Sequence, residues 1–112
     1  MGGTPRRTHE CELCLRQVSR ITRHHLIPKT RHKNKRTRRR HDREERTTRI
    51  AMLCRPCHSN IHAHFTEKEL ADELNTIALL RERPEIQAFT EFMAGKPDGF
   101  RVRHKTAGRK RR

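Results

Sequence analysis

The sequence predicts a small single-domain α+β protein whose fold is stabilised through its four cysteines. The chain has 112 residues, a length that suits one domain. Only 30% of the residues are hydrophobic and 4% are aromatic, so the apolar core alone gives little stability. The cysteines form two Cys-x-x-Cys pairs, Cys11/Cys14 and Cys54/Cys57.

The first half of the chain is predicted to hold a short hairpin and a long basic segment. Residues 1–9 have the composition of a disordered N-terminus. Residues 10–28 carry spaced apolar residues, with Ser19-Arg20 as the candidate hairpin turn. Residues 29–49 form a basic insertion without an apolar residue that could anchor it. We therefore expect a long mobile segment there, ordered only by a ligand.

The second half is predicted to be helical. One helix begins near Pro56, and Thr66 with Glu69 has the pattern of a capping box for the next. Pro84 suits the first position of a last helix, and Gly95 suits its end. These helices carry no evident chemistry, so we expect them to cover the core or to dimerise.

The charge distribution indicates a nucleic-acid partner. The net charge is +15, and residues 29–49 contain 11 Lys/Arg against 3 Asp/Glu. The helical extension, residues 66–95, has 3 against 7, and the basic flexible tail, residues 96–112, has 8 against 1. Such basic segments bind phosphate backbones without regard to sequence. The alternatives are a solubilising role for the last residues and a membrane surface, which the missing apolar stripe disfavours.

The N-terminus gives an expectation of compartment. Residues 1–7 are small, polar and basic, with no apolar run behind them, so no signal peptide is expected. No stretch is apolar enough to span a bilayer. We therefore expect a cytoplasmic protein, where paired Cys-x-x-Cys motifs bind metal more often than they form disulfides.

The two Cys-x-x-Cys pairs predict a structural zinc site. Each turn directs two thiolates to one point, and two turns complete a tetrahedron. Here 39 residues separate Cys14 from Cys54, so the second turn comes from a distant part of the chain. A thioredoxin-like redox pair would need a βαβ context that this sequence lacks. A zinc finger with two cysteines and two histidines would need a shorter and regular spacing.

Four histidines have the spacing of a second metal site. His24 and His25 adjoin a buried apolar run, and strand geometry sends them to opposite faces. His58 and His62 are four residues apart and share one face of the predicted helix. Three imidazoles on one divalent ion, with a fourth to accept a proton from water, make a hydrolytic site. A metalloprotease is excluded because Ser59 stands where that motif needs Glu.

Three sequence blocks carry a resemblance to a known family. They run CELC over residues 11–14, RHHLIP over 23–28 and LCRPCHSNIHA over 53–63. Residues 10–65 resemble the HNH endonucleases that have a four-cysteine zinc site around a ββα-metal core. The resemblance implies that fold, with a basic insertion, and metal-dependent hydrolysis of phosphodiester bonds in DNA.

The resemblance also implies individual roles. His25 is then the general base that activates water, and His24, His58 and His62 are the ligands of the catalytic ion. The middle Asn of the family, which braces the loop carrying the base, is not identified before Cys54. The available asparagines, Asn34 and Asn60, lie in the basic insertion and within the helix.

Elementary chemistry agrees with these roles. A divalent ion relieves charge on the scissile phosphate as a Lewis acid. A neutral histidine, with an ordinary pKa near 6.5, activates water near neutral pH. Imidazole ligands suit Mn²⁺ or Ni²⁺ better than Mg²⁺, although Mg²⁺ is the abundant candidate. The residues expected to contact phosphates are Arg23, Arg36, Arg38, Arg39, Arg40 and Arg55.

Two further interpretations stay open. The chain could be a non-catalytic zinc-stabilised nucleic-acid-binding module, which the missing Asn favours. It could also be a basic scaffold for RNA, which leaves the four histidines without a role. For the nuclease, double-stranded DNA is the expected substrate, by nicking or by double-strand cutting. One site cuts one strand, so double-strand cutting requires a homodimer or two visits.

Overall fold

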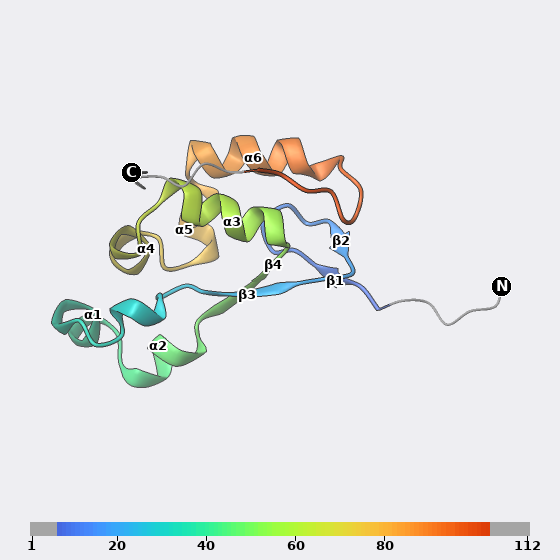
Figure 1. The fold of residues 1–112 in the computed structure, drawn as a ribbon. Coiled ribbons are helices and arrows are strands. Elements are labelled where there is room, and N and C mark those ends of the chain that lie inside the picture. Colours follow the sequence, from blue (N-terminus) through green and yellow to red (C-terminus); the bar gives the residue numbers. More distant parts are fainter. Residues whose placement is uncertain (1–6, 104–112) are drawn as a thin grey trace, which may run out of the picture.

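The computed structural model describes residues 7–103, in which two short antiparallel strand pairs lie beneath a layer of helices (Figure 1). The expected small α+β class is confirmed. In chain order the elements are β1 (His9–Glu10), β2 (Gln17–Val18), β3 (Thr22–His25), the 3₁₀ turn η1 (Lys29–Arg31), α1 (Lys35–Arg40), α2 (Arg43–Thr48), β4 (Ile50–Leu53), α3 (Arg55–His64), α4 (Glu67–Glu73), α5 (Ile77–Arg81) and α6 (Pro84–Ala94).

The strand pairing differs from the predicted hairpin. β1 pairs with β2, so the first Cys-x-x-Cys turn closes that hairpin. β3 pairs with β4, in a register that sets Thr22 opposite Leu53. The turn predicted at Ser19-Arg20 is therefore wrong, because these residues join two strands that belong to different sheets. The reason is burial: β4 alternates half-buried and buried residues, and pairing with β3 covers its backbone.

The core lies between the β3–β4 pair and the helices. Leu53 of β4 and Ile61 of α3 are fully buried. α6 lies along α3 in Figure 1 and contributes Ile86 and Met93 to the same cluster. The histidine-bearing helix α3 is thus packed between the sheet and α6, which fixes the position of its side chains.

The predicted helix signals in the second half are confirmed. Thr66 and Glu69 form both hydrogen bonds of a capping box at the start of α4. α6 starts at Pro84, and Gly95 is its C-cap. Among residues 7–103, no helix combines the length and the apolar character that a bilayer crossing requires.

The basic insertion has more secondary structure than expected. Residues 29–49 contain η1, α1 and α2 instead of a segment without regular structure. The cause is capping of the helices by polar side chains, which a pattern of apolar residues does not reveal. Asn34 accepts hydrogen bonds from two backbone N–H groups of α1, and Asp42 forms a capping box with Glu45 at α2. Thr37, which is 1% exposed, gives α1 its buried contact.

The described part of the basic tail is also ordered against the core. The carboxylate of Asp98 accepts hydrogen bonds from the Ser19 backbone N–H at 3.2 and 3.1 Å. Phe100 and Val102 pack against the core cluster. Residues of the described part of the predicted tail, 96–103, therefore contact the core. The rest of the tail and most of the predicted disordered N-terminus lie outside the described residues.

Candidate metal centres

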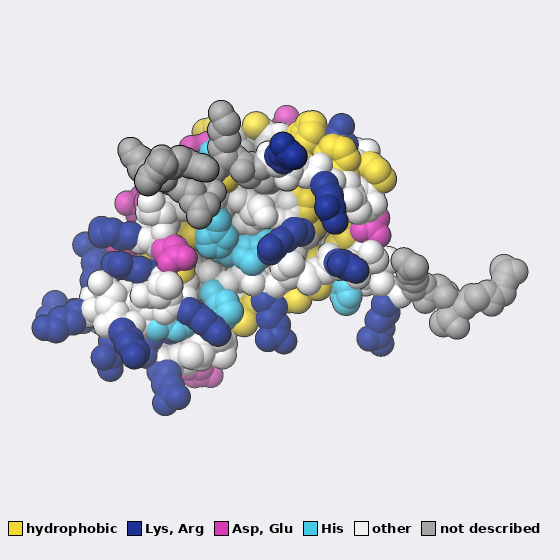
Figure 2. Space-filling view, in the orientation of Figure 1, with side chains coloured by type: hydrophobic (Ala, Val, Ile, Leu, Met, Phe, Trp, Pro, Cys, Tyr) yellow, Lys and Arg dark blue, Asp and Glu magenta, His cyan; other side chains and the backbone are white. Residues whose placement is uncertain are grey.

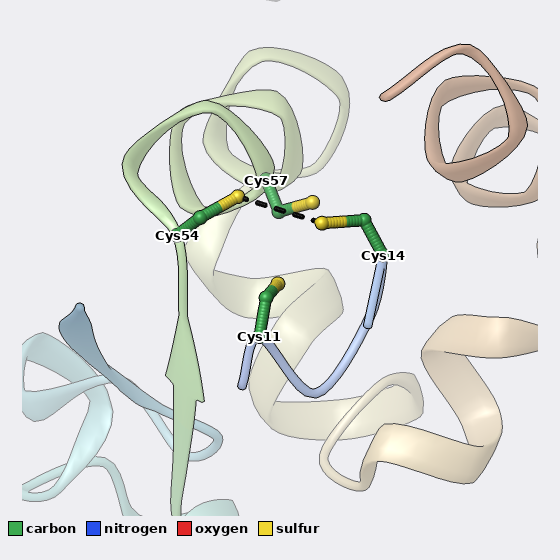
Figure 3. Close-up of side chains that lie close together, drawn as sticks. All are labelled: Cys11, Cys14, Cys54 and Cys57. Atoms are coloured by element: carbon green, nitrogen blue, oxygen red, sulfur yellow. Dashed lines mark hydrogen bonds between the residues drawn. The ribbon is translucent and has the colours of Figure 1, made fainter. Parts of the chain in front are cut away.

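The four cysteines meet at one buried point, as the sequence predicts. Figure 3 shows the sulfur atoms of the β1–β2 turn directed toward those at the start of α3. All four sulfur atoms lie within 4.8 Å of one another, and the Cys14 and Cys54 sulfurs are 3.8 Å apart. A tetrahedral zinc ion with Zn–S bonds of about 2.3 Å sets its sulfurs about 3.8 Å apart. The four-cysteine cluster is therefore compatible with a zinc site.

The electrostatics of the cluster favour a bound cation. Hydrogen bonding with Cys11 lowers the pKa of Cys14 well below that of an ordinary thiol. Hydrogen bonding with Cys11 and Cys14 raises the pKa of Cys57. A first thiolate therefore opposes ionisation of its neighbours when no metal is bound. A coordinating ion removes this conflict because it holds thiols in the deprotonated form.

Arg16 adds a second positive charge beside the sulfurs. Its Nε donates to the Cys14 sulfur at 3.4 Å, and its Nη2 donates to the Cys54 sulfur at 3.4 Å. The side chain is 9% exposed, so it approaches the sulfurs where water screens the attraction little. A tetrathiolate zinc centre carries net negative charge, and Arg16 is placed to offset part of it.

The first Cys-x-x-Cys turn is closed by backbone bonds at the cost of local strain. The Leu15 N–H donates to the Cys11 carbonyl at 2.9 Å. Leu15 has φ 66°, and no other non-glycine residue among residues 7–103 has a positive φ. Its side chain is 56% exposed, so packing does not explain a conformation that L-residues disfavour. The geometry of the turn imposes it.

Three of the four predicted site histidines form a second cluster. His24 comes from β3, and His58 and His62 come from α3. Their ring centroids are 5.2 to 5.4 Å apart, and one nitrogen of each lies within 4.8 Å of the others. The spacing of four residues on a helix and the alternation of the strand produce this convergence, as predicted.

His24 is a buried polar group without a partner among the described residues. It is 1% exposed, and neither ring nitrogen has a hydrogen-bond partner within residues 7–103. A neutral imidazole has one N–H donor and one acceptor nitrogen, and leaving a buried polar group unpaired costs about 1–3 kcal/mol. A cation bound to one nitrogen of His24 would satisfy the acceptor. The donor set therefore fits a divalent ion with imidazole ligands.

Thr22 fixes the tautomer of His58. The Thr22 hydroxyl lies 2.7 Å from the Leu53 carbonyl oxygen and 2.8 Å from His58 Nδ1. Its single hydrogen goes to the carbonyl, which can only accept, so Nδ1 must carry the proton that the hydroxyl oxygen accepts. The free lone pair of His58 is then on Nε2. A histidine that binds a metal through one ring nitrogen commonly hydrogen-bonds through the other. No sequence pattern singled out Thr22 for this contact.

The three clustered histidines are neutral at physiological pH. Burial first, and then the neighbouring His58 and His62, lower the pKa of His24 to about 3. Burial likewise lowers the pKa of His58 to about 4 and also lowers that of His62, an effect that the nearby Glu67 opposes. Neutral imidazoles are the form that binds metal.

His25 does not join the cluster of three. It follows His24 on β3 and is half-buried, as expected for the opposite strand face. Burial, the positive charge of Lys29 and the nearby His32 and Arg23 lower its pKa. The charge of His25 in turn contributes to the lowered pKa of His58. Its ring is therefore a neighbour of the cluster and remains unprotonated at neutral pH.

The six predicted phosphate-binding arginines fall into two groups. Arg55 opens α3, and its charge contributes to the lowered pKa of His58 and His62. Arg23 is exposed on β3, next to His24. The others are the exposed arginines of α1, which lies at the far end of the molecule from β1 in Figure 1: Arg36, Arg38, Arg39 and Arg40. Of these, Arg36 forms an ion pair with Asp72 at 3.9 Å.

The loop that follows His25 is braced by an arginine. The Leu26 N–H donates to the Arg49 carbonyl at 3.0 Å. The Arg49 guanidinium donates to Glu45 Oε2 at 3.0 Å and to the backbone and side-chain oxygens of Asn75 at 3.2 and 3.3 Å. Asn75 lies between α4 and α5, so sequence distance concealed this contact.

The two asparagines available for the role of the family's middle Asn do not lie at the loop after His25. Asn34 caps α1, and Asn60 is buried within α3. Within residues 7–103 neither side chain bonds to the loop after His25. That loop is held instead by the Leu26 N–H on the Arg49 carbonyl and by the His32 ring, whose Nε2 lies 2.7 Å from the Ile27 carbonyl oxygen.

A comparison with known proteins places the chain in a family. It is 36% identical over 104 residues to the uncharacterized protein YisB of Bacillus subtilis (strain 168), and the match covers 91% of this chain and 90% of that protein. The chain belongs to the YisB family. No family model matches it, and no solved structure does.

The buried histidines of this YisB-family protein predict acid sensitivity. Unfolded histidine titrates near 6.5, whereas His24 titrates at about 3 in the fold, so the unfolded chain binds more protons between these values and stability falls as pH falls. For His24 alone we expect a loss of about 2 kcal/mol between pH 7 and pH 5. Urea unfolding at both pH values measures it.

The variant His24→Leu separates this effect from acid loss of a metal at the four cysteines, which the wild type and the variant would share. Its free energy of unfolding is expected to depend less on pH than that of the wild type. Equal pH slopes in the two proteins would contradict the assignment.

Proposed function

We propose that this YisB-family protein is a metal-dependent endonuclease of the HNH type that hydrolyses phosphodiester bonds of DNA. The observation that carries the proposal is the convergence of His24, His58 and His62, with the buried His24 lacking any partner among the described residues. An antiparallel strand pair followed by a helix, with histidines on strand and helix, supports it. The four-cysteine cluster at the start of that helix also supports it.

The residues of the site have separate tasks in this proposal. His24, His58 and His62 hold a divalent ion, which when bound stabilises negative charge on the scissile phosphate as a Lewis acid. Thr22 holds the His58 ring in the tautomer that leaves Nε2 free. His25, with its lowered pKa, accepts the proton of the attacking water at a ring nitrogen.

Positive charge around the histidines supports a polyanionic substrate. Figure 2 shows Lys and Arg side chains on both sides of the histidine group on this face. Arg55 and Arg23 adjoin the site in the chain and in the fold. We assign both to the phosphates nearest the histidines. Arg38, Arg39 and Arg40 of α1 are exposed and suit a more distant part of a duplex.

The first test is a plasmid assay with the full chain. We expect supercoiled plasmid to be converted to nicked or linear DNA with Mn²⁺, Ni²⁺ or Mg²⁺ added, and to stay intact without an added ion. Imidazole ligands favour the transition metals, so the faster reaction is expected with Mn²⁺ or Ni²⁺. Gel electrophoresis over time measures both products. Linear DNA at early times would indicate paired sites, as in a homodimer.

A second candidate function is a zinc-stabilised nucleic-acid-binding module without catalysis. The observation that favours it is the missing Asn: Asn34 caps α1, and within residues 7–103 neither Asn34 nor Asn60 bonds to the loop after His25. In that case the chain would retard DNA in a gel yet leave plasmid intact with every ion. This result would reject the nuclease and retain the zinc site.

A further inference from the structure

An open pocket beside the histidine cluster has the features of a second anion-binding site. The pocket has a volume of about 750 Å³ and is walled by three segments that are distant in sequence. They are residues 16–22 around the end of β2, residues 54–59 at the start of α3, and residues 98–102 after α6. The volume lies within the range of pockets that hold a whole small ligand, so it exceeds what one free ion requires.

Three arginines of this pocket have no partner among the described residues. Arg20, Arg55 and Arg101 line it and are exposed. Within residues 7–103 none of their guanidinium groups makes a hydrogen bond or an ion pair. The carboxylate in the wall, Asp98, is already engaged by the Ser19 N–H. With three arginines against one carboxylate, the exposed side chains of the pocket carry net positive charge on a concave surface.

Arg16 also lines the pocket, but its guanidinium is used in hydrogen bonds that hold the fold together. Its Nη1 donates to the Lys96 and Pro97 carbonyls at 3.2 and 2.8 Å, while its other nitrogens bind the cysteine sulfurs. One side chain thus ties the segment after α6 to the four-cysteine cluster. The wall that carries Arg101 is held in place by this contact.

The pocket and the histidine cluster share a wall. Thr22 lines the pocket and binds His58 Nδ1 at 2.8 Å. Arg55 also lines the pocket, and its charge contributes to the lowered pKa of both His58 and His62. Ser59, the residue after His58, faces the pocket as well. Thr22, Arg55 and Ser59 therefore place the pocket directly beside the histidines, although no histidine lines it.

We propose that this pocket, lined by Arg20, Arg55 and Arg101, binds the phosphate groups of a nucleic-acid strand that flank the phosphate at the histidine cluster. Guanidinium groups match phosphate oxygens in geometry and charge. The proposal rests on the proposed function for the identity of the substrate. It adds Arg20 and Arg101, which the sequence did not single out, to the phosphate contact already assigned to Arg55.

The test compares two double variants that remove equal charge. Arg20→Gln/Arg101→Gln changes the pocket, and Arg7→Gln/Lys68→Gln changes two exposed residues outside it. Binding of a fluorescein-labelled 12-nucleotide strand, alone and in a duplex, is measured by anisotropy at several salt concentrations. The zinc-loaded full chain is used with no other divalent ion, so cleavage does not interfere. Circular dichroism and zinc content verify folding.

The pocket variant is expected to weaken binding about tenfold and to reduce the slope of log K against log [salt] by about 0.7–0.9 for each lost phosphate contact. The control variant is expected to keep the wild-type slope. Equal losses in both variants would overturn the proposal, because net charge alone would explain them. Unchanged oligonucleotide binding, with loss of inorganic phosphate or of an acidic peptide, would overturn it in favour of those ligands.

The result is independent of catalysis. If no ion supports plasmid cleavage but the pocket variant loses affinity and slope, the subsite stands and the nuclease proposal fails. If plasmid is cut and the pocket variant binds as the wild type does, the nuclease proposal stands and the subsite fails.

Discussion

Removing the metal from the four cysteines is expected to abolish the cooperative fold. The cysteines are part of the core cluster, and they join the β1–β2 turn to the start of α3. Metal binding by such sites contributes about 10–16 kcal/mol in small zinc domains, which is comparable to the whole stability of a typical protein. Without it, the sulfurs repel as thiolates or remain as poorly packed thiols.

The measurement is urea or thermal unfolding followed by circular dichroism in reducing buffer, before and after a chelator removes zinc. Cys57→Ser should unfold in the same way, because it deletes one ligand at the start of α3. Leu15→Asn is the matched control, since it changes an exposed residue of the other turn and removes no ligand. A cooperative transition that survives zinc removal would reject the structural role of the metal.

Replacing His25 with alanine is expected to reduce DNA cleavage by about 10²–10⁴-fold while leaving DNA affinity unchanged. The variant removes the proposed proton acceptor and none of the three clustered histidines. Half-burial and the positive charge of Lys29 lower the pKa of His25, so the wild type is unprotonated at neutral pH. The cleavage rate should therefore fall as pH drops below the ordinary value near 6.5.

Single-turnover cleavage and gel retardation, run side by side, measure the two quantities. His64→Ala is the matched control, because His64 ends the same helix as His58 and is exposed outside the cluster. Full activity in His25→Ala would exclude His25 as the base. Parallel loss of affinity would instead assign it to binding. A pH–rate profile that stays flat below about pH 6 would argue against a neutral histidine base.

Several local features of the fold could be predicted because their signals are short in range. The capping box of Thr66 and Glu69 and the start of α6 at Pro84 depend on neighbours within one helical turn. The basic insertion shows the limit of the apolar pattern. Its helices begin at the capping residues Asn34 and Asp42. Both caps are visible in the sequence, but the high charge of the segment favoured the prediction of an irregular one.

The pairing of the strands could not be predicted in the same way. The choice of β4 as the partner of β3 depends on which faces become buried together, although a long insertion separates the two strands in sequence. The same holds for Arg16, whose bonds to Lys96 and Pro97 span the chain. It also holds for Arg49 with Asn75. No spacing rule connects such residues.

The convergence of the cysteines and of the histidines could be predicted from the sequence, because Cys-x-x-Cys turns and histidines four residues apart on a helix converge by local geometry. Long-range packing sets three other features: which histidine is buried and unpaired among the described residues, which hydroxyl fixes the tautomer of His58, and which arginines line one pocket. Burial and partnership depend on segments brought together by packing of the whole core. The local pattern of residues does not contain that information.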